Sequence, residues 1–273
     1  MSDTDEQFTQ VIEQAMDALH DGDYEQALVL LDQASALKPD DSLAYFTRGV
    51  VNLSQQDLES AHASLSQAIE LEPDSVENYT TRCFVRLLKG DLNAALEDMT
   101  SAIGVGPKRG GLYYQRAVIL NDLDRQDEAM ADINQAIRLA PEDALYYLYR
   151  AEIHYRNGDL ASALTDLNES ARLDPNDAQT LTLRAELYFE LGQYEQALAD
   201  FEQLNRLRPG AEDVHAGIAI TRHALGQIDE AQRMWRMLIR AIDARYEDAD
   251  WLQEELDWAD PLAEEARTLI ASL

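Results

Sequence analysis

The sequence predicts an all-α fold, a solenoid of seven helix–turn–helix repeats. Three classes of residue recur every 34 positions, and they do so in one register. The prolines of this lattice are Pro39, Pro73, Pro107, Pro141, Pro175 and Pro209. The alanines are Ala27, Ala61, Ala95, Ala129, Ala163, Ala197 and Ala231. Four residues after each alanine stands a large apolar residue, namely Leu31, Leu65, Met99, Ile133, Leu167, Phe201 and Trp235. A period shared by three residue classes indicates one supersecondary unit repeated along the chain.

Residues 144–177 show how one period divides into two short amphipathic helices. One face of the first helix carries Tyr147, Ala151 and His154. Gly158 ends this helix, because glycine readily adopts the left-handed conformation that follows a helix, and Asp159 then offers an N-cap. The apolar face of the second helix carries Leu160, Ala163, Leu164 and Leu167. Pro175 prevents this helix from continuing. Since the chain has no long run of alternating apolar and polar residues, we expect helices throughout.

The repeats account for most of the chain and leave a short segment at each end. Residues 1–7 are predicted to form an acidic N-terminal tail. Residues 246–273 are predicted to form C-terminal capping helices, because the last repeat of a solenoid exposes an apolar surface that must be covered. Trp251 and Trp258 belong to this cap in our interpretation, and a partner-binding patch is the alternative. The seventh repeat departs from the lattice, with Asp243 at the proline position. The predicted repeats span 8–41, 42–75, 76–109, 110–143, 144–177, 178–211 and 212–245.

The charge of the chain excludes several classes of partner. Its 273 residues include 52 acidic and 22 basic side chains, which give a formal net charge of −30. Phosphate contacts need a basic surface, so we expect neither nucleic-acid binding nor docking on anionic membranes. The sequence lacks a run of roughly 18 consecutive apolar residues. It also lacks the basic and apolar start of a signal peptide, so the predicted location is cytoplasmic.

Residues that could carry chemistry do not form a constellation. The one cysteine, Cys83, stands where other repeats have glycine or alanine. This position predicts a buried packing role, and a single cysteine excludes an internal disulfide. His215 and His223 are too far apart along a helix to share a metal ion. The glycine-rich segment 104–111 lacks the Gly-Lys-Ser/Thr ending of a phosphate-binding loop. We therefore predict no catalytic, cofactor-binding or metal-binding residues, and no enzyme activity.

Two types of charged residue also follow the 34-residue period. The arginines of the first helices are Arg48, Arg82, Arg116, Arg150 and Arg184. The aspartates of the second helices are Asp98, Asp132, Asp166 and Asp200. One interpretation is a row of arginines that binds an acidic ligand. The other is a ladder of partly buried ion pairs between packed helices, which we favour because both charges recur together.

In several repeats the first helix carries a tyrosine, an arginine three positions later, and then a small residue. The pattern appears as Tyr45-x-x-Arg48-Gly49, Tyr79-x-x-Arg82-Cys83, Tyr113-x-x-Arg116-Ala117 and Tyr147-x-x-Arg150-Ala151. With the alanine and proline lattice, it resembles the tetratricopeptide repeat family, whose signature has leucine where this chain has arginine. The resemblance covers all seven predicted repeats. It implies a right-handed superhelix in which the first helices line a concave groove that binds peptides.

A second apolar stripe runs along the first helices, one residue after the positions that pack each repeat internally. Its i, i+4, i+7 spacing places it on one helix face, which the resemblance assigns to the groove. From the fifth repeat onward the stripe becomes more polar. The alternative is that these side chains seal adjacent first helices against each other. The candidate groove residues are Ile12, Met16, Phe46, Val50, Phe84, Tyr114, Val118, Tyr149 and Tyr155.

The groove determines the predicted function. The family's Lys, Asn and Arg clamp for a terminal carboxylate is not matched, because the corresponding positions of the first five repeats hold no basic residue. Aromatic anchors such as Phe46 and Phe84, between acidic walls, favour a protein or peptide ligand with apolar anchors and basic flanks. We predict a non-enzymatic interaction scaffold or adaptor that needs no cofactor. The alternatives are a self-associating homo-oligomer and, more remotely, an enzyme or a regulatory subunit of an enzyme.

Overall fold

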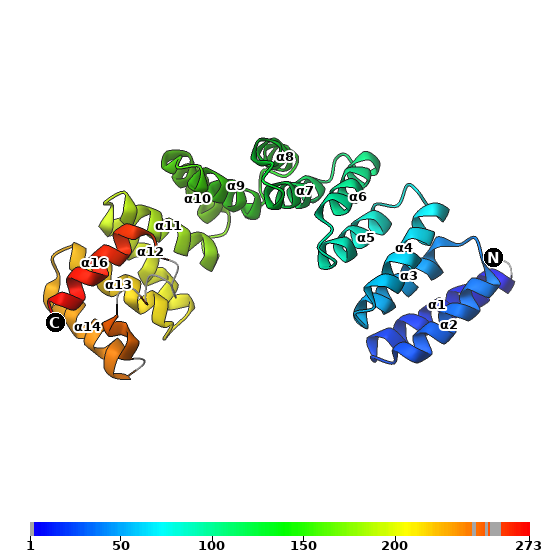
Figure 1. Cartoon of the computed structure of the whole chain (residues 1–273), viewed down its shortest axis with the longest axis horizontal. Coiled ribbons are helices and arrows are strands. Elements are labelled where there is room, and N and C mark those ends of the chain that lie inside the picture. Colours follow the sequence, from blue (N-terminus) through cyan, green and yellow to red (C-terminus); the bar gives the residue numbers. More distant parts are fainter. Residues whose placement is uncertain (1–2, 242–243, 249–250, 252–257) are drawn as a thin grey trace. The chain divides into compact units, whose positions relative to one another are not determined.

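The computed structural model describes residues 3–241, 244–248, 251 and 258–273, and in these residues every regular element is helical (Figure 1). The chain forms two compact units, Met1–Ala140 and Pro141–Leu273, which we call unit 1 and unit 2. Within the described residues, no helix is long and apolar enough to cross a membrane. The predicted all-α repeat fold is confirmed.

Unit 1 contains four helix pairs in its described residues, and each of the first three packs against the pair that follows it. The first helix of each pair lies beside its second helix (Figure 1). The helices are α1 (Asp3–His20), α2 (Tyr24–Leu37), α3 (Ser42–Ser54), α4 (Leu58–Leu71), α5 (Val76–Leu88), α6 (Leu92–Val105), α7 (Gly110–Asp122) and α8 (Gln126–Leu139).

In its described residues, unit 2 contains three further pairs, a short 3-10 helix and a terminal helix. Its elements are α9 (Ala144–Arg156), α10 (Leu160–Leu173), α11 (Ala178–Glu190), α12 (Tyr194–Leu207), α13 (Glu212–Ala224), α14 (Ile228–Ala241), η1 (Ala244–Glu247) and α16 (Asp260–Ala271). Helix η1 packs against α14. The Nε1 of Trp235 in α14 donates a hydrogen bond to the Tyr246 carbonyl oxygen at 3.0 Å.

The turn between the two helices of a pair is formed by the same local features in most repeats, a residue with positive φ and a capping side chain after it. Gly158 adopts a φ of 75°, as predicted for a glycine after a helix. Asp159 then caps α10, because its carboxylate accepts a hydrogen bond from the Ser162 backbone N–H. Two repeats make the same turn without glycine, with Gln56 at φ 62° and Asp124 at φ 57°. The turn geometry is therefore kept even where the sequence signal for it is missing.

The alanine lattice forms the contact between the two helices of each pair. All seven lattice alanines are fully buried, and the large apolar residue four positions after each of them is buried as well. The approach is close elsewhere too, since a Cβ atom on Gly49 of α3 would lie 2.6 Å from Cγ of Leu65 in α4. Cys83 is buried at the equivalent position of α5, which confirms its predicted packing role.

The N-terminal end of the chain differs from the tail that we predicted. Helix α1 begins at Asp3, so residues 3–7 belong to the first helix instead of a separate tail. The helix expected around Trp251 and Trp258 falls largely outside the described residues. Trp258 itself is buried, and Trp251 packs edge-on against Tyr246. The terminal helix α16 packs mainly on α13 and α11, which are first helices, and less on α14.

Candidate functional site

An apolar cavity lies between the first helices α5 and α7 of unit 1, and Met99 of α6 also lines it. We call it the α5–α7 cavity, and its volume is about 560 Å³. This is within the range of natural ligand sites. It is lined by Thr80, Thr81, Cys83, Phe84, Leu87, Met99, Tyr114, Gln115, Val118, Ile119 and Asp122.

Three of the predicted groove residues meet in this cavity. Phe84 comes from α5, whereas Tyr114 and Val118 come from the same stripe on α7. Phe84 is 50% exposed, which is unusual for a large apolar side chain, and Tyr114 and Val118 are half-buried. Their i, i+4 spacing on α7 places Tyr114 and Val118 one turn apart on one face. The structure thus brings together an apolar surface from two first helices that are 34 residues apart in sequence.

The polar side chains of the cavity are distributed unevenly. Thr80 and Thr81 lie at one end of the cavity. Their hydroxyls both donate to the Glu77 carbonyl oxygen of their own helix, at 3.2 and 2.8 Å. At the other end lies Asp122, the last residue of α7. A helix C-terminus carries partial negative charge, so this end of the cavity favours a cation. The lining is therefore apolar in the middle and negative at one end.

Cys83 lies in the wall of the cavity, and its thiol is unreactive. Burial, together with the nearby Asp98 carboxylate, raises the pKa of its thiol to about 12. A thiol with such a pKa stays protonated at neutral pH and is a poor nucleophile. Its contribution to the site is packing.

The other predicted groove residues in unit 1 do not line this cavity. Met16 is 54% exposed on α1, while Ile12 is only 4% exposed and packs with Phe8 and Ala15. Phe46 is half-buried and packs against the cluster formed by Ala61, Leu65 and Val85. Val50 is half-buried on the same helix, α3. We therefore leave Ile12 and Phe46 out of the candidate site, because their side chains serve the interior.

In unit 2 the stripe is more polar, as the sequence indicates. Tyr149 is buried, and Tyr155 is half-buried with its hydroxyl 3.1 Å from a carboxylate oxygen of Glu190. A second cavity, of about 450 Å³, lies between α9 and α11. It is lined by Glu152, Ala178, Gln179, Thr182, Leu183, Glu186 and Arg208. Burial raises the pKa of Glu152, whose carboxylate accepts a hydrogen bond from Gln179 at 2.8 Å.

The first-helix face at the end of unit 2 is covered by the chain itself. Helix α16 lies across α11 and α13 (Figure 1). The sequence pattern predicts the apolar face of α16 but not the surface that receives it. One polar contact marks this surface. His223 stands at a stripe position of α13, and its Nδ1 lies 2.5 Å from a carboxylate oxygen of Glu265 in α16. A single histidine in the stripe does not identify the helix that it contacts.

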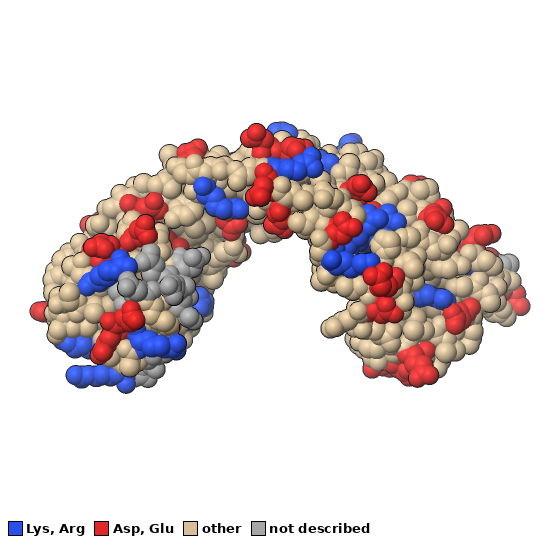
Figure 2. Space-filling model, viewed as in Figure 1, with Lys and Arg blue, Asp and Glu red and all other residues tan. Residues whose placement is uncertain are grey.

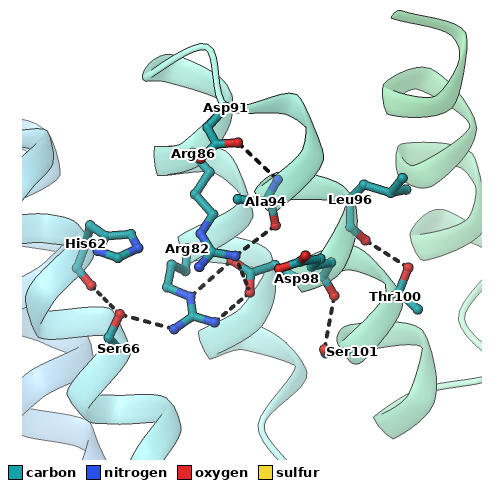
Figure 3. A network of polar contacts seen from close by, with 11 residues as sticks. His62, Ser66, Arg82, Arg86, Asp91, Ala94, Leu96, Asp98, Thr100 and Ser101 are labelled. Atoms are coloured by element: carbon teal, nitrogen blue, oxygen red, sulfur yellow. Dashed lines mark hydrogen bonds and ion pairs between the residues drawn. The ribbon is translucent and has the colours of Figure 1, made fainter. Parts of the chain in front are cut away.

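The arginine lattice is internal, which removes it from the candidate site. Arg82 of α5 donates to Asp98 of α6 through Nε at 3.0 Å and Nη2 at 2.6 Å, and through Nη1 to the Ser66 hydroxyl of α4 at 3.1 Å (Figure 3). Arg86 reaches the same carboxylate at 3.0 Å. The paired geometry recurs for Arg116 with Asp132, Arg150 with Asp166 and Arg184 with Asp200.

Arg48 is the exception in this ladder. It pairs with Asp32 of the preceding helix α2, at 2.6 Å, because the residue at the usual aspartate position is Ser64. The structure therefore supports the predicted ion-pair ladder over a row of arginines that waits for an acidic ligand. Each guanidinium ties a first helix to a neighbouring second helix.

The visible surface is rich in carboxylates. Figure 2 shows acidic side chains spread over the face of each unit, with lysine and arginine interspersed among them. Among the described residues, no group of three or more His, Cys, Asp or Glu is placed to hold a metal ion.

Comparisons with known proteins agree with this architecture. Models of the tetratricopeptide repeat match residues 18–81, 111–143, 150–217 and 188–251, which together make up more than half of the chain. No curated protein matches the sequence. The chain is similar to the solved structure of PilF from Pseudomonas aeruginosa, with a TM-score of 0.64 and 19% identity, over 77% of this chain and 96% of that one.

Two further solved structures are similar in fold. A tetratricopeptide repeat protein from Parabacteroides merdae has a TM-score of 0.62 and 18% identity, over 97% of this chain and 99% of that one. YrrB, described as a repeat protein with an unusual peptide-binding site, has a TM-score of 0.54 and 21% identity, over 66% of this chain and 93% of that one. At such identities the likeness concerns the fold.

Proposed function

Because this chain belongs to the tetratricopeptide repeat family, a general protein–protein interaction module, we propose that it is a non-enzymatic scaffold that binds a protein or peptide segment. The proposed binding surface is the α5–α7 cavity of unit 1. The observation that carries the proposal is the exposure of Phe84 beside Tyr114 and Val118. Burying such an apolar surface in a partner contact is favourable, and aromatic side chains commonly dominate these contacts.

The charges favour a ligand with basic residues beside its apolar anchors. Asp122 lies at one end of the α5–α7 cavity. The whole chain carries a net charge of −30. Such a field attracts cationic segments and speeds their encounter in a salt-dependent manner.

A peptide selection tests this function. Random 16-residue peptides displayed on phage would be selected against the immobilised full chain, and the affinity of the selected peptides would be measured by isothermal titration calorimetry. We expect enriched peptides that combine large apolar residues with Lys or Arg. Their dissociation constant should rise at least tenfold for Phe84→Ala, because removing an interface anchor costs about 2 kcal/mol or more.

Met16→Ala is the matched control for this experiment. Met16 holds the stripe position of α1 that Phe84 holds in α5, it is 54% exposed, and it does not line the cavity. Binding should survive this change. The proposal fails if no peptide is enriched over a blank surface, or if Phe84→Ala and Met16→Ala affect the selected peptides equally. A concentration-dependent rise in mass that Phe84→Ala abolishes would assign the cavity to self-association instead.

A further inference from the structure

Helix α16 shows which kind of element covers a face of the first helices in this chain. In unit 2, α16 packs on α11 and α13 and turns one face inward. The buried residues of that face are Leu262, Ala263, Ala266 and Leu269. The i, i+4, i+7 spacing of Leu262, Ala266 and Leu269 is that of an amphipathic helix. The covering element is therefore a helix with small and aliphatic contacts.

The surface beneath α16 corresponds by repeat position to the α5–α7 cavity. Ile220 of α13 occupies the stripe position of Val118 in α7, and Phe189 of α11 occupies that of Leu87 in α5. The position of Phe84 is held in α11 by Glu186, which is half-buried and lines the neighbouring cavity between α9 and α11. Ile220 and Phe189 are buried in the same cluster as the apolar face of α16. Their equivalents Val118 and Leu87, in contrast, are only half-buried. Equivalent positions are thus covered by a helix in unit 2 and uncovered in unit 1.

The chemistry of the cavity also favours a helix over an extended peptide. An extended segment would bring its backbone N–H and C=O groups into the cavity, and burying them without hydrogen bonds is costly. The hydroxyls of Thr80 and Thr81 already donate to the Glu77 carbonyl oxygen. Gln115 brings the one amide group of the lining, which can serve one peptide group, and the rest of its centre is apolar. A helix satisfies its backbone groups internally and presents side chains alone.

The dimensions fit two turns of such a helix. The lining of α5 extends from Thr80 to Leu87 and that of α7 from Tyr114 to Asp122. At a rise of about 1.5 Å per residue, these stretches are about 10–12 Å long. A ligand helix lying along them would contribute residues at i, i+4 and i+7. Asp122, at the end of α7, would face one terminus of that contact.

We infer that the α5–α7 cavity binds an amphipathic α-helix of a partner protein, with small or aliphatic residues on its inner face and Lys or Arg near Asp122. This inference rests on the proposed function and specifies its ligand. A second copy of this chain does not fit the description. Its α16 is acidic at Glu264 and Glu265, next to its apolar face, and is engaged in its own unit.

Two synthetic peptides test the shape of the ligand. The helical probe has the sequence of residues 260–273 with the changes Asp260→Lys, Glu264→Lys and Glu265→Lys, which keep the apolar face and reverse its flanking charge. The broken probe carries in addition Thr268→Pro and Ala271→Pro on the exposed face, which disrupt the helix and leave every residue of its inner face in place. Each is labelled at its N-terminus, checked for helicity by circular dichroism, and titrated with the full chain by fluorescence anisotropy.

We expect the helical probe to bind, and the broken probe to bind at least tenfold more weakly. Phe84→Ala and Val118→Thr should each weaken the helical probe at least tenfold, whereas Met16→Ala should not. Val118→Thr preserves side-chain size and keeps the test valid if Phe84→Ala changes the melting temperature. Equal binding of both probes overturns the inference, as does binding of the helical probe that neither cavity variant weakens.

The peptide selection separates this failure from failure of the proposed function. If both probes fail to bind while selected peptides depend on Phe84, the helical ligand is wrong and the binding site stands. If the selection also yields no peptide that depends on Phe84, the proposed function falls together with the inference.

Discussion

The residues of the arginine ladder show how a periodic charge can serve the fold. Asp132 is almost fully buried and receives two hydrogen bonds from the Arg116 guanidinium, at 2.6 and 2.8 Å. Hydrogen bonding to this carboxylate raises the pKa of Arg116, although burial opposes it. The planar, bidentate geometry fixes the register between α7 and α8. Lysine, as a point charge, would not give the same geometry.

The first prediction at this scale concerns the pair itself. Arg116→Met leaves the buried Asp132 carboxylate without its partner, and we expect a loss of about 3 kcal/mol in stability, measured from the urea midpoint. The double variant Arg116→Met with Asp132→Leu should recover most of this loss, because an apolar pair carries no desolvation penalty. Arg125→Met, which breaks the exposed pair with Glu128, is the control and should leave the midpoint unchanged. A wild-type midpoint for Arg116→Met would contradict the account.

A second prediction concerns the half-buried carboxyl of Glu152. Burial raises its pKa above the ordinary 4.5, so the folded chain holds this proton more tightly than the unfolded chain. Stability is therefore lost as the pH rises through the raised pKa, and no loss exists below pH 4.5. Glu152→Gln should raise the melting temperature at pH 7 and leave it unchanged below pH 4.5, measured by scanning calorimetry.

The control for this change is Glu195→Gln on an exposed position of α12, where we expect no difference at either pH. A Glu152→Gln variant that melts lower at pH 7, or one whose effect is the same at both pH values, would contradict the assigned role of burial.

Single residues also show where sequence reasoning reaches its limit. Ile12 and Met16 belong to the same predicted stripe, yet Ile12 is buried and Met16 is exposed. Period and hydrophobicity place both on one helix face. They do not say how far a neighbouring helix extends over that face. Tyr149 was likewise predicted as a groove residue and is buried. The exposure of each stripe position depends on packing between elements.

At the scale of elements, most of the helices could be predicted, because their signals are local. Asp57 and Asp91, like Asp159, cap second helices at the places that the repeat indicates. The pairing of helices also follows from the lattice, since small residues recur where two helices touch. The position of α16 could not be predicted in this way. The spacing of Leu262 and Leu269 predicts an apolar face on this helix. Such a face can pack on any exposed apolar surface, so the spacing does not identify the helices that it contacts.

The prediction for this element is a local loss of stability. Leu262 is fully buried on the inner face of α16, and Leu262→Ala should cost about 2–5 kcal/mol. Repeats are held by their neighbours alone, so the effect should be confined to unit 2. Hydrogen exchange followed by mass spectrometry should show faster exchange in α11, α13 and α16, with α3 and α5 unchanged. Faster exchange along the whole chain would contradict a local role for α16.

At the scale of the whole molecule, charge dominates. A net charge of −30 makes the folded chain repel itself, and salt screens this repulsion. We expect the melting temperature to rise between about 10 mM and 1 M sodium chloride, where the Debye length falls from about 30 to 3 Å. The ladder pairs oppose this trend only weakly, because buried pairs are screened less than exposed charges. A flat or falling melting temperature would show that the exposed carboxylates are already compensated.

The central claim is that the uncovered first-helix face at α5 and α7 is the binding surface, and side-chain footprinting tests it most directly. The full chain would be oxidised by hydroxyl radicals with and without a saturating amount of the lysine-bearing helical probe, and the modified residues would be quantified by mass spectrometry. Phe84 and Met16 are similarly exposed in the free chain, at 50% and 54%. We predict that the bound probe lowers the oxidation rate of Phe84 severalfold and leaves that of Met16 unchanged. An unchanged rate at Phe84, with the probe demonstrably bound, would contradict the claim.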